Sequence, residues 1–341
     1  MAGFDTLAAM TFPRSGTGLD PASLGDRIAE LPLWPFGRLR DLTHARIGID
    51  YGLSGEAYRV RGTTAAGEAI SLVVKLEKAD AVSRAVAFHE ALGDRLGRAV
   101  PACFGGLIDA AAATGLLILE DVAPAEQGDV LGDPGSDRLE AAILVFARLH
   151  ALSVRAGGAD HEASLPRWRA APLARAAWAS RLEVATARYP EVLSRPILAR
   201  LADVPDRLGP AIERLQAGPA SWIHSDAHLD NVLWRSDGSA VVVDWAGAAM
   251  GPPAIDASRF ILEGPPAVSR SVARRDALLR AYRLAAPALP NELFVDAALV
   301  FVQGVVGWAG RTDVGEPSRR MADLRVNALG NIRAWLESDA G

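Results

Sequence analysis

The segment WIHSDAHLDNVLW, residues 222–234, holds two histidines, two aspartates and an asparagine between apolar flanks. Four residues separate Asp226 from Asn231. This is the spacing of a phosphotransferase catalytic loop, in which the aspartate accepts the proton of the attacking hydroxyl and the asparagine holds metal. A second aspartate, at the end of the following strand, holds the metal that bridges the phosphates in such enzymes. Asp244 follows the next apolar run and fills that place. The spacing therefore indicates phosphoryl transfer.

A second chemistry is compatible with the same segment. His224, Asp226 and His228 are spaced two apart. Alternate side chains of an extended segment share one face, so these three residues can ligate zinc as a hydrolase site does. The sequence therefore leaves a zinc-dependent hydrolase open as an alternative.

A hairpin is expected to position two of the metal ligands. Asp237-Gly238 is a strong signal for a two-residue turn between β-rich flanks. Asn231 lies six residues before Asp237, and Asp244 lies six after Gly238, so this turn would place them opposite each other, with Cβ atoms about 5 Å apart. An amide oxygen and a carboxylate that converge in this way suit Mg²⁺, which prefers oxygen ligands.

The elements around these residues change in character along the chain. Residues 1–45 read as an N-terminal helical extension packed on the lobes, with one helix over 21–35. Residues 46–122 are β-rich and include the runs AYRVRG and AISLVVKLEK. Residues 123–341 are mostly helical, with one β interruption at 231–244. The expected fold is α+β, with a small β-rich lobe and a larger helical lobe.

Composition excludes several classes of protein. The 341 residues carry 41 acidic and 36 basic side chains, a net charge of −5, which argues against a general nucleic-acid-binding protein. A single cysteine, Cys103, allows no intramolecular disulfide. The N-terminus lacks the features of a signal peptide, and no run has the length and apolarity expected of a membrane span. A cytoplasmic protein without a membrane partner is the expectation.

With these residues in view, the chain resembles the aminoglycoside phosphotransferase superfamily of small-molecule kinases, and most of all its choline-kinase-like and ecdysteroid-kinase-like branches. The family pattern His-Gly-Asp-x-x-x-x-Asn is matched by His224 to Asn231, and its Asp-Trp pair by Asp244-Trp245. GPPAIDASRF, residues 251–260, resembles the segment whose aspartate, here Asp256, braces the catalytic loop. The resemblance runs from about residue 46 to 285. It implies a bilobal protein-kinase-like fold, ATP and Mg²⁺ as cofactors, and a small-molecule alcohol as acceptor.

The resemblance also implies roles for residues of the β-rich part. Lys75, one of only two lysines in the chain, takes the place of the lysine that contacts the nucleotide phosphates. Glu120 and Val122 fall in the hinge whose backbone bonds adenine. The loop that covers the phosphates would contain Gly52, Ser54 and Gly55, because their backbone N–H groups can approach phosphate closely. His224 supports the loop in which Asp226 acts as the catalytic base.

Two positions depart from the family pattern. Ser225 replaces the glycine between His224 and Asp226. Ala85 stands where a helix glutamate normally pairs with the lysine. Lys75 then pairs with another carboxylate, such as Glu77 or Asp80, or is held by phosphate alone. The loss of this glutamate keeps a third possibility open, a nucleotide-binding pseudokinase that acts as an interaction module.

The acceptor is constrained mainly by charge. It should bind among the helices of residues 123–341, which offer four tryptophans, Trp168, Trp178, Trp308 and Trp335. Residues 290–341 mix seven acids with five arginines and form no acidic wall for a polycationic aminoglycoside. An uncharged or partly apolar alcohol is therefore expected.

Overall fold

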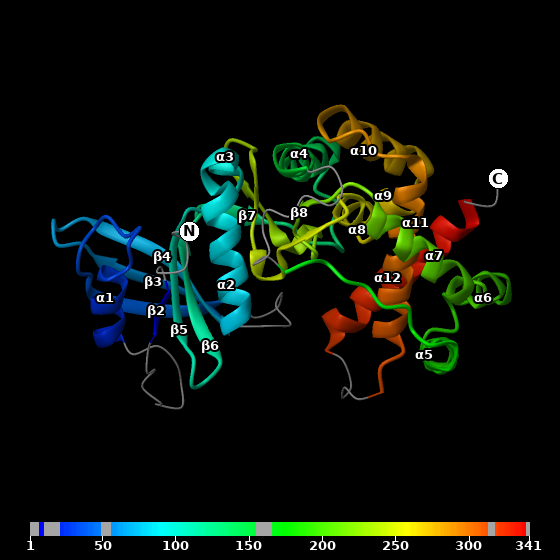
Figure 1. The fold of residues 1–341 in the computed structure, drawn as a ribbon, viewed down its shortest axis with the longest axis horizontal. Helices are drawn as coiled ribbons and strands as arrows, with labels where there is room; N and C mark the ends of the chain where they lie inside the picture. The colour runs from blue at the N-terminus through cyan, green and yellow to red at the C-terminus, as the bar shows by residue number, and fades with distance from the viewer. Residues whose placement is uncertain (1–6, 10–20, 49–55, 155–165, 313–317, 339–341) are drawn as a thin grey trace. The chain divides into compact units, whose positions relative to one another are not determined.

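The computed structural model describes residues 7–9, 21–48, 56–154, 166–312 and 318–338. The chain divides into two compact units (Figure 1). The first comprises residues 1–125 and 241–248, and the second comprises 126–240 and 249–341. The first unit is built on a β-sheet and the second is mostly helical, so the predicted α+β class, with a small β-rich part and a larger helical part, is confirmed.

The first unit contains a six-stranded sheet with the order β1-β5-β6-β4-β3-β2. All neighbouring strands are antiparallel except β1 and β5. The strands are β1 (Leu7–Ala9), β2 (Arg40–Ile47), β3 (Glu56–Thr63), β4 (Ala69–Lys78), β5 (Cys103–Asp109) and β6 (Thr114–Glu120). The two quoted β-rich runs form β3 and β4. The sequence did not reveal β2 and β5, because β2 is a mostly exposed edge strand and β5 contains two glycines.

Alternation along β4 decides which side chains reach the site. Leu72 and Val74 point into a core shared with helix α1 (Pro21–Ala29), and they are 1% and 0% exposed. Successive side chains of a strand point to opposite faces, so Lys75 and Glu77 project together from the other face. β4 lies between β3 and β6, which places Lys75 on an interior strand of the sheet.

Helix α2 (Ala79–Phe88) packs against β4, β5 and β6. Gly115 of β6 allows close approach, since an added Cβ there would lie 3.1 Å from Val82. The other end of α2 stacks Phe88 on Trp245, with ring centroids 3.7 Å apart. Arg84 Nε also donates to the Ala246 carbonyl at 2.8 Å. Both contacts fix the segment that directly follows Asp244. The chain then continues through a π-helical turn (His89–Gly93), α3 (Asp94–Leu96) and a 3₁₀ turn (Gly97–Ala99).

The described helices of the second unit pack around α11, which contacts α5, α7, α8 and α12. They are α4 (Ser136–Ser153), α5 (Arg175–Arg188), α6 (Arg195–Ala202), α7 (Val204–Ala217), α8 (Ala254–Leu262), α9 (Pro266–Ser269), α10 (Val272–Ala285), α11 (Asn291–Ala309) and α12 (Arg319–Ser338). Local residue types mark the starts of two of these helices. Pro205 lies in the first turn of α7, which begins after Asp203, and the Ser271 side chain caps α10 by accepting the Arg274 N–H.

Helix α11 is long and apolar enough by length and composition to cross a membrane, and 56% of that stretch is buried inside the structure. Leu299, Val302 and Val306 of α11 belong to the main core of the second unit. The apolar character of α11 is therefore accounted for by its central place in the helical packing.

Short strands frame the motif-bearing loops. β9 (Val232–Arg235) lies between β10 (Ala240–Val242) and β7 (Ala125–Gln127). β8 (Ser221–Ile223) pairs antiparallel with β11 (Ala249–Gly251). Together these strands hold both ends of the segment between Ile223 and Val232.

The turn between β9 and β10 corrects the expected register. The Arg235 N–H bonds the Ser239 carbonyl at 3.0 Å, and the Gly238 N–H bonds the Arg235 carbonyl at 2.9 Å. The loop thus contains Ser236 as well as Asp237 and Gly238, with Gly238 in the left-handed conformation at φ +80°. Counted outward from this turn, Asn231 is opposite Val243. The expected pairing of Asn231 with Asp244 is therefore wrong by one residue.

The buried side chain of His89 indicates that the fold is less stable in acid. Its ring is 8% exposed, and neither ring nitrogen has a hydrogen-bond partner among the described residues. Burial lowers the pKa of His89 to about 4 from its ordinary value of 6.5. Below about pH 6.5 the unfolded chain binds a proton at His89, whereas the folded chain does not. The free energy of unfolding therefore falls as the pH drops.

We expect this one group to reduce the free energy of unfolding by roughly 2–3 kcal/mol between pH 6.5 and pH 4. Chemical denaturation of His89→Leu across this range should show a flatter dependence on pH than the native protein. His44→Leu, at an exposed position on β2, is the matched control and should retain the native slope. An unchanged slope in His89→Leu would contradict the assignment.

Candidate active site

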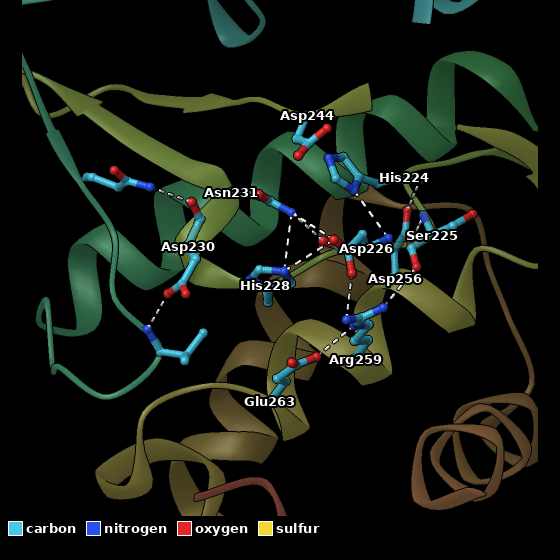
Figure 2. A network of polar contacts seen from close by, with 12 residues as sticks. His224, Ser225, Asp226, His228, Asp230, Asn231, Asp244, Asp256, Arg259 and Glu263 are labelled. Atoms are coloured by element: carbon cyan, nitrogen blue, oxygen red, sulfur yellow. Dashed lines mark hydrogen bonds and ion pairs between the residues drawn. The ribbon is translucent and has the colours of Figure 1, made fainter. Parts of the chain in front are cut away.

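The loop after β8 is held by a carboxylate from α8. Asp256 is 0% exposed and accepts the backbone N–H groups of His224 at 2.6 Å and Ser225 at 2.9 Å. His150 Nε2 lies 3.2 Å from the same carboxylate, and its Nδ1 is 2.7 Å from the hydroxyl of Tyr282. Asp256 therefore braces the loop, as the family pattern implies (Figure 2).

His224 supports the loop from inside the second unit. Its side chain is 0% exposed, and its ring lies edge-on to Phe146. Nδ1 accepts the backbone N–H of Asp226 at 3.2 Å. Ser225, between them, has a φ of +67°, a conformation that suits the glycine of the family pattern better than a serine. The buried His224 fixes the backbone direction at Asp226.

Asp226 is the accessible carboxylate of the loop, with 45% of its side chain exposed. Its Oδ1 pairs with Arg259 Nη2 at 2.6 Å, and its Oδ2 lies 3.3 Å from His228 Nε2. Burial acts to raise the pKa of Asp226, but Arg259 and then His228 outweigh it and hold that pKa far below its ordinary value. Asp226 is therefore ionised at neutral pH.

Asn231 lies against Asp226 through its amide nitrogen. Nδ2 donates to the Asp226 carbonyl at 2.9 Å and lies 3.3 Å from the Asp226 carboxylate (Figure 2). All hydrogen-bond contacts of the Asn231 side chain with described residues are made by Nδ2, and none by Oδ1. A free amide oxygen beside an ionised carboxylate is a donor set that fits Mg²⁺.

The opposite side of the loop is tied to the rest of the second unit. The Asp230 carboxylate accepts the Val130 N–H at 2.9 Å and pairs with Arg320 Nη2 of α12 at 2.8 Å. Arg320 also pairs with Asp129 at 3.0 Å. Sequence reasoning missed Arg320 and Arg259 as site residues, although Arg259 lies inside the quoted motif GPPAIDASRF. A charged residue on a helix gives no local signal of its distant partner.

Lys75 and Asp244 meet in the first unit. Lys75 Nζ lies 2.7 Å from Asp244 Oδ1 and 3.3 Å from Glu77 Oε1. Asp80, the other carboxylate considered from the sequence, pairs instead with Arg84 at 2.6 Å. Burial acts to lower the pKa of Lys75, but Asp244 and Glu77 raise it above its ordinary value. The ammonium is therefore charged, and Glu77 takes the place left by Ala85.

Asp244 itself has an unusual backbone, with a φ of +68° immediately before a 3₁₀ turn (Trp245–Gly247). Its side chain is 29% exposed. Oδ1 bonds Lys75, while no described residue hydrogen-bonds Oδ2. One carboxylate oxygen thus remains for a cation, which fits the predicted metal role.

The predicted nucleotide-binding residues have different outcomes. Gly52, Ser54 and Gly55 lie outside the described residues. The backbone N–H of Glu120 is already bonded to the Ala102 carbonyl at 2.8 Å, so it is not free for a base. Val122 follows the end of β6, and its backbone has no hydrogen bond to any described residue.

The zinc alternative receives no support from the geometry. Within the described ranges, no group of three or more His, Cys, Asp or Glu side chains is arranged to hold a metal ion. His228 Nε2 lies 3.3 Å from Asp226 Oδ2, but His224 uses Nδ1 to accept a backbone N–H, so the three residues do not form a ligand set.

Comparison with known proteins agrees with this geometry. Residues 47–293, well over half of the chain, match the model of the phosphotransferase enzyme family. The search of curated proteins gives no match.

Solved structures share the fold at low sequence identity. A spectinomycin phosphotransferase, solved with ADP and spectinomycin, has a TM-score of 0.58 at 12% identity, covering 87% of this chain and 93% of that one. A protein from Ralstonia eutropha, provisionally described as an aminoglycoside phosphotransferase, has a TM-score of 0.56 at 17% identity, covering 88% and 93%. A thermostable mutant of an aminoglycoside phosphotransferase, in a ternary complex with AMP-PNP and hygromycin B, has a TM-score of 0.51 at 17% identity, covering 90% and 96%. The resemblance seen in the sequence is confirmed: this chain belongs to the phosphotransferase enzyme family.

Proposed function

We propose that the protein is a kinase that transfers the γ-phosphate of ATP to a hydroxyl of a small molecule. The observation that carries this proposal is the Asp226–Asn231 arrangement, an accessible ionised carboxylate beside an amide oxygen without a partner. The family match and the ADP and AMP-PNP complexes of the similar structures support nucleotide as the donor.

The first unit contributes the groups that hold the nucleotide. Lys75 binds the phosphates as a compact point charge. The free backbone of Val122 is the remaining hinge group for adenine, and the loop of Gly52, Ser54 and Gly55 would add backbone N–H groups toward the phosphates. Asp244 would hold Mg²⁺ through its unpaired oxygen, and a metal bound there would supply charge neutralisation for the transferred phosphate.

The second unit contributes the groups that act on the acceptor. Asp226 accepts a hydrogen bond from the attacking hydroxyl, orients it and takes its proton as the bond to phosphorus forms. Asn231 supplies a metal ligand, while His224 and Asp256 fix the loop. Because Asp226 is a weak base beside Arg259, most of its effect is expected from orientation of the hydroxyl.

Thermal unfolding in the presence of ligands tests the proposal. ATP with Mg²⁺ should raise the melting temperature, because a ligand that binds only the folded state stabilises it by mass action. A library of hydroxylated metabolites, assayed for ADP release, should then contain an acceptor. No shift with ATP–Mg²⁺ would contradict nucleotide binding. A shift without turnover on any alcohol would favour the pseudokinase, and stoichiometric zinc in the purified protein would favour the hydrolase.

Glu77→Gln should weaken nucleotide use. Loss of the carboxylate removes one of the two anions that hold Lys75 in the absence of ATP. Glu77 would be the anion left to hold Lys75 when Asp244 binds Mg²⁺. We expect the KM for ATP to rise about tenfold, the effect typical of one charged hydrogen bond. Asp80→Asn is the matched control and should leave the KM unchanged, since Asp80 pairs with Arg84. Equal effects of the two substitutions would refute a specific role for Glu77.

A further inference from the structure

Arg325 of α12 is a buried cation that forms no ion pair with a residue in the described ranges. The residue is 3% exposed, and its guanidinium carbon lies 5.1 Å from the centre of the Trp308 ring on α11. Nε and Nη1 are both buried, and no described residue hydrogen-bonds either nitrogen. The aromatic ring is the contact that orients this guanidinium.

Several other arginines on or beside α11 and α12 have partners. Arg320 pairs with Asp129 and Asp230, and Arg333 pairs with Glu337 one turn along α12. On α5, Arg181 donates to the Gly310 carbonyl and Arg188 to the Arg311 carbonyl, so both cap the end of α11.

Among the described residues, no carboxylate pairs with Arg325. Its neighbours one turn away on α12 are Met321, Ala322, Ala328 and Leu329. The buried acid of α11, Asp296, is already held by two hydrogen bonds from Arg214, at 2.7 and 2.9 Å. Burial of a charge without a counter-ion is strongly unfavourable. The compensating anion is therefore expected from a bound molecule.

Open space lies over Gly304, on the same face of α11 as Trp308. Gly304 is exposed and precedes Trp308 by one helical turn, so the two positions share a face of α11. A Cβ placed on Gly304 would meet no atom of the described residues within 4 Å. A ligand can thus lie over Gly304 and reach the Trp308 ring.

This place is linked to the catalytic loop by one extended segment. The Trp168 N–H bonds the Met250 carbonyl at 2.7 Å, and Met250 pairs with Trp222 of β8, just before His224. Farther along, the Leu173 N–H bonds Gln303 of α11 at 2.7 Å. The five residue-to-residue steps from Trp168 to Leu173 span at most about 18 Å. An elongated small molecule can therefore reach both ends.

We propose that Arg325 and Trp308 form a subsite for an oxyanion group, a carboxylate, sulfate or phosphate, carried by the acceptor alcohol. This inference rests on the proposed function for the identity of the ligand, and it replaces the uncharged acceptor expected from composition. Trp308 provides a flat apolar wall beside the charge, so the acceptor places a planar or apolar portion next to its anionic group. A polycationic aminoglycoside is the wrong charge for this subsite.

The first test needs no catalysis. Sodium sulfate and sodium chloride are titrated at equal ionic strength while thermal unfolding is recorded for the native protein, Arg325→Met and Arg333→Met. The native protein and Arg333→Met should show a saturable sulfate-specific rise in melting temperature, which Arg325→Met should lack. Arg333→Met removes a surface ion pair from the same helix and is the matched control. Gly304→Leu, which leaves Arg325 in place but fills the open space, should weaken the sulfate response.

The sulfate titrations distinguish a result that supports the subsite from results that overturn it. A saturable response that is absent only in Arg325→Met and weakened in Gly304→Leu supports the subsite. The proposal is overturned if the native protein shows no sulfate-specific rise, or if Arg325→Met shows an equal rise. It is also overturned if Gly304→Leu does not weaken the response, which would indicate an adventitious ion only. If Arg325→Met does not fold, Gly304→Leu and Arg325→Lys provide the same comparison.

Matched acceptors test the second half of the proposal. Pairs of alcohols that differ by one carboxylate or sulfate are assayed at saturating ATP. The anionic member should have the lower KM, and Arg325→Met should raise that KM roughly 10- to 100-fold with little change for the neutral member. A sulfate response without this discrimination would show that the anion is a separate effector and would overturn the acceptor assignment. Absence of turnover on every alcohol would count against the proposed function and leave the sulfate result standing.

Discussion

Replacement of Asp226 by asparagine is expected to lower kcat about a thousandfold, the loss typical of a positioned acid–base group. Asparagine keeps the size of the side chain but cannot accept the hydroxyl proton, and it offers an amide nitrogen where an oxygen is needed. The Arg259 guanidinium, paired with Asp226 at 2.6 Å, would also lose one of its anions. Affinity for ATP–Mg²⁺ should survive, because Lys75 and Asp244 belong to the first unit.

Steady-state kinetics together with calorimetric titration of ATP–Mg²⁺ would measure this separation. Asp237→Asn makes the same chemical change in the exposed turn between β9 and β10 and should retain native kcat. Turnover of Asp226→Asn within a few-fold of the native rate would show that the hydroxyl proton goes elsewhere. A parallel loss of nucleotide affinity would instead indicate that Asp226 helps to hold metal.

Substitution of Asp256 by asparagine should produce the largest loss of stability. The carboxylate is fully buried and accepts two backbone N–H groups as well as lying beside His150. An asparagine side chain has one oxygen, so its amide nitrogen would face a donor and leave at least one buried N–H unsatisfied. We expect the free energy of unfolding of the second unit to fall by roughly 3–5 kcal/mol.

Denaturant unfolding measured by tryptophan fluorescence would follow this change, with Ser258→Ala as control. Ser258, on the same helix, donates one neutral hydrogen bond to the Phe294 carbonyl at 3.0 Å, and its loss should lower stability by only about 1 kcal/mol. Activity of Asp256→Asn should fall as well, because the loop that carries Asp226 loses its brace. An inactive variant with native stability would indicate that Asp256 contacts the reacting molecules directly.

Local pattern was sufficient for much of the molecule. The alternation of ISLVVKLEK predicts a strand, and period two then places Lys75 and Glu77 on one face. The spacing of Asp226 and Asn231 likewise predicts their proximity, because residues five apart in a single loop have few ways to separate. The α+β class follows from the change from β-rich to helical composition along the chain.

A local prediction failed where conformation depended on one backbone angle. Asp237-Gly238 signals a turn, but the turn also includes Ser236, because Gly238 alone is left-handed and Asp237 is not. One added loop residue changes every pairing in the hairpin. Residue types near a turn therefore predict its presence better than its register.

Only the tertiary structure decided the charges of the site. Lys75 and Asp244 are 169 positions apart in the chain, and Arg259 lies on a helix well beyond Asp226. Likewise, α12 places Arg320 between two carboxylates, whereas no described carboxylate pairs with Arg325. The sequence determines which groups can be charged, but Coulomb interactions fall with distance and depend on burial. The state of each group, and so its chemistry, is set by folding.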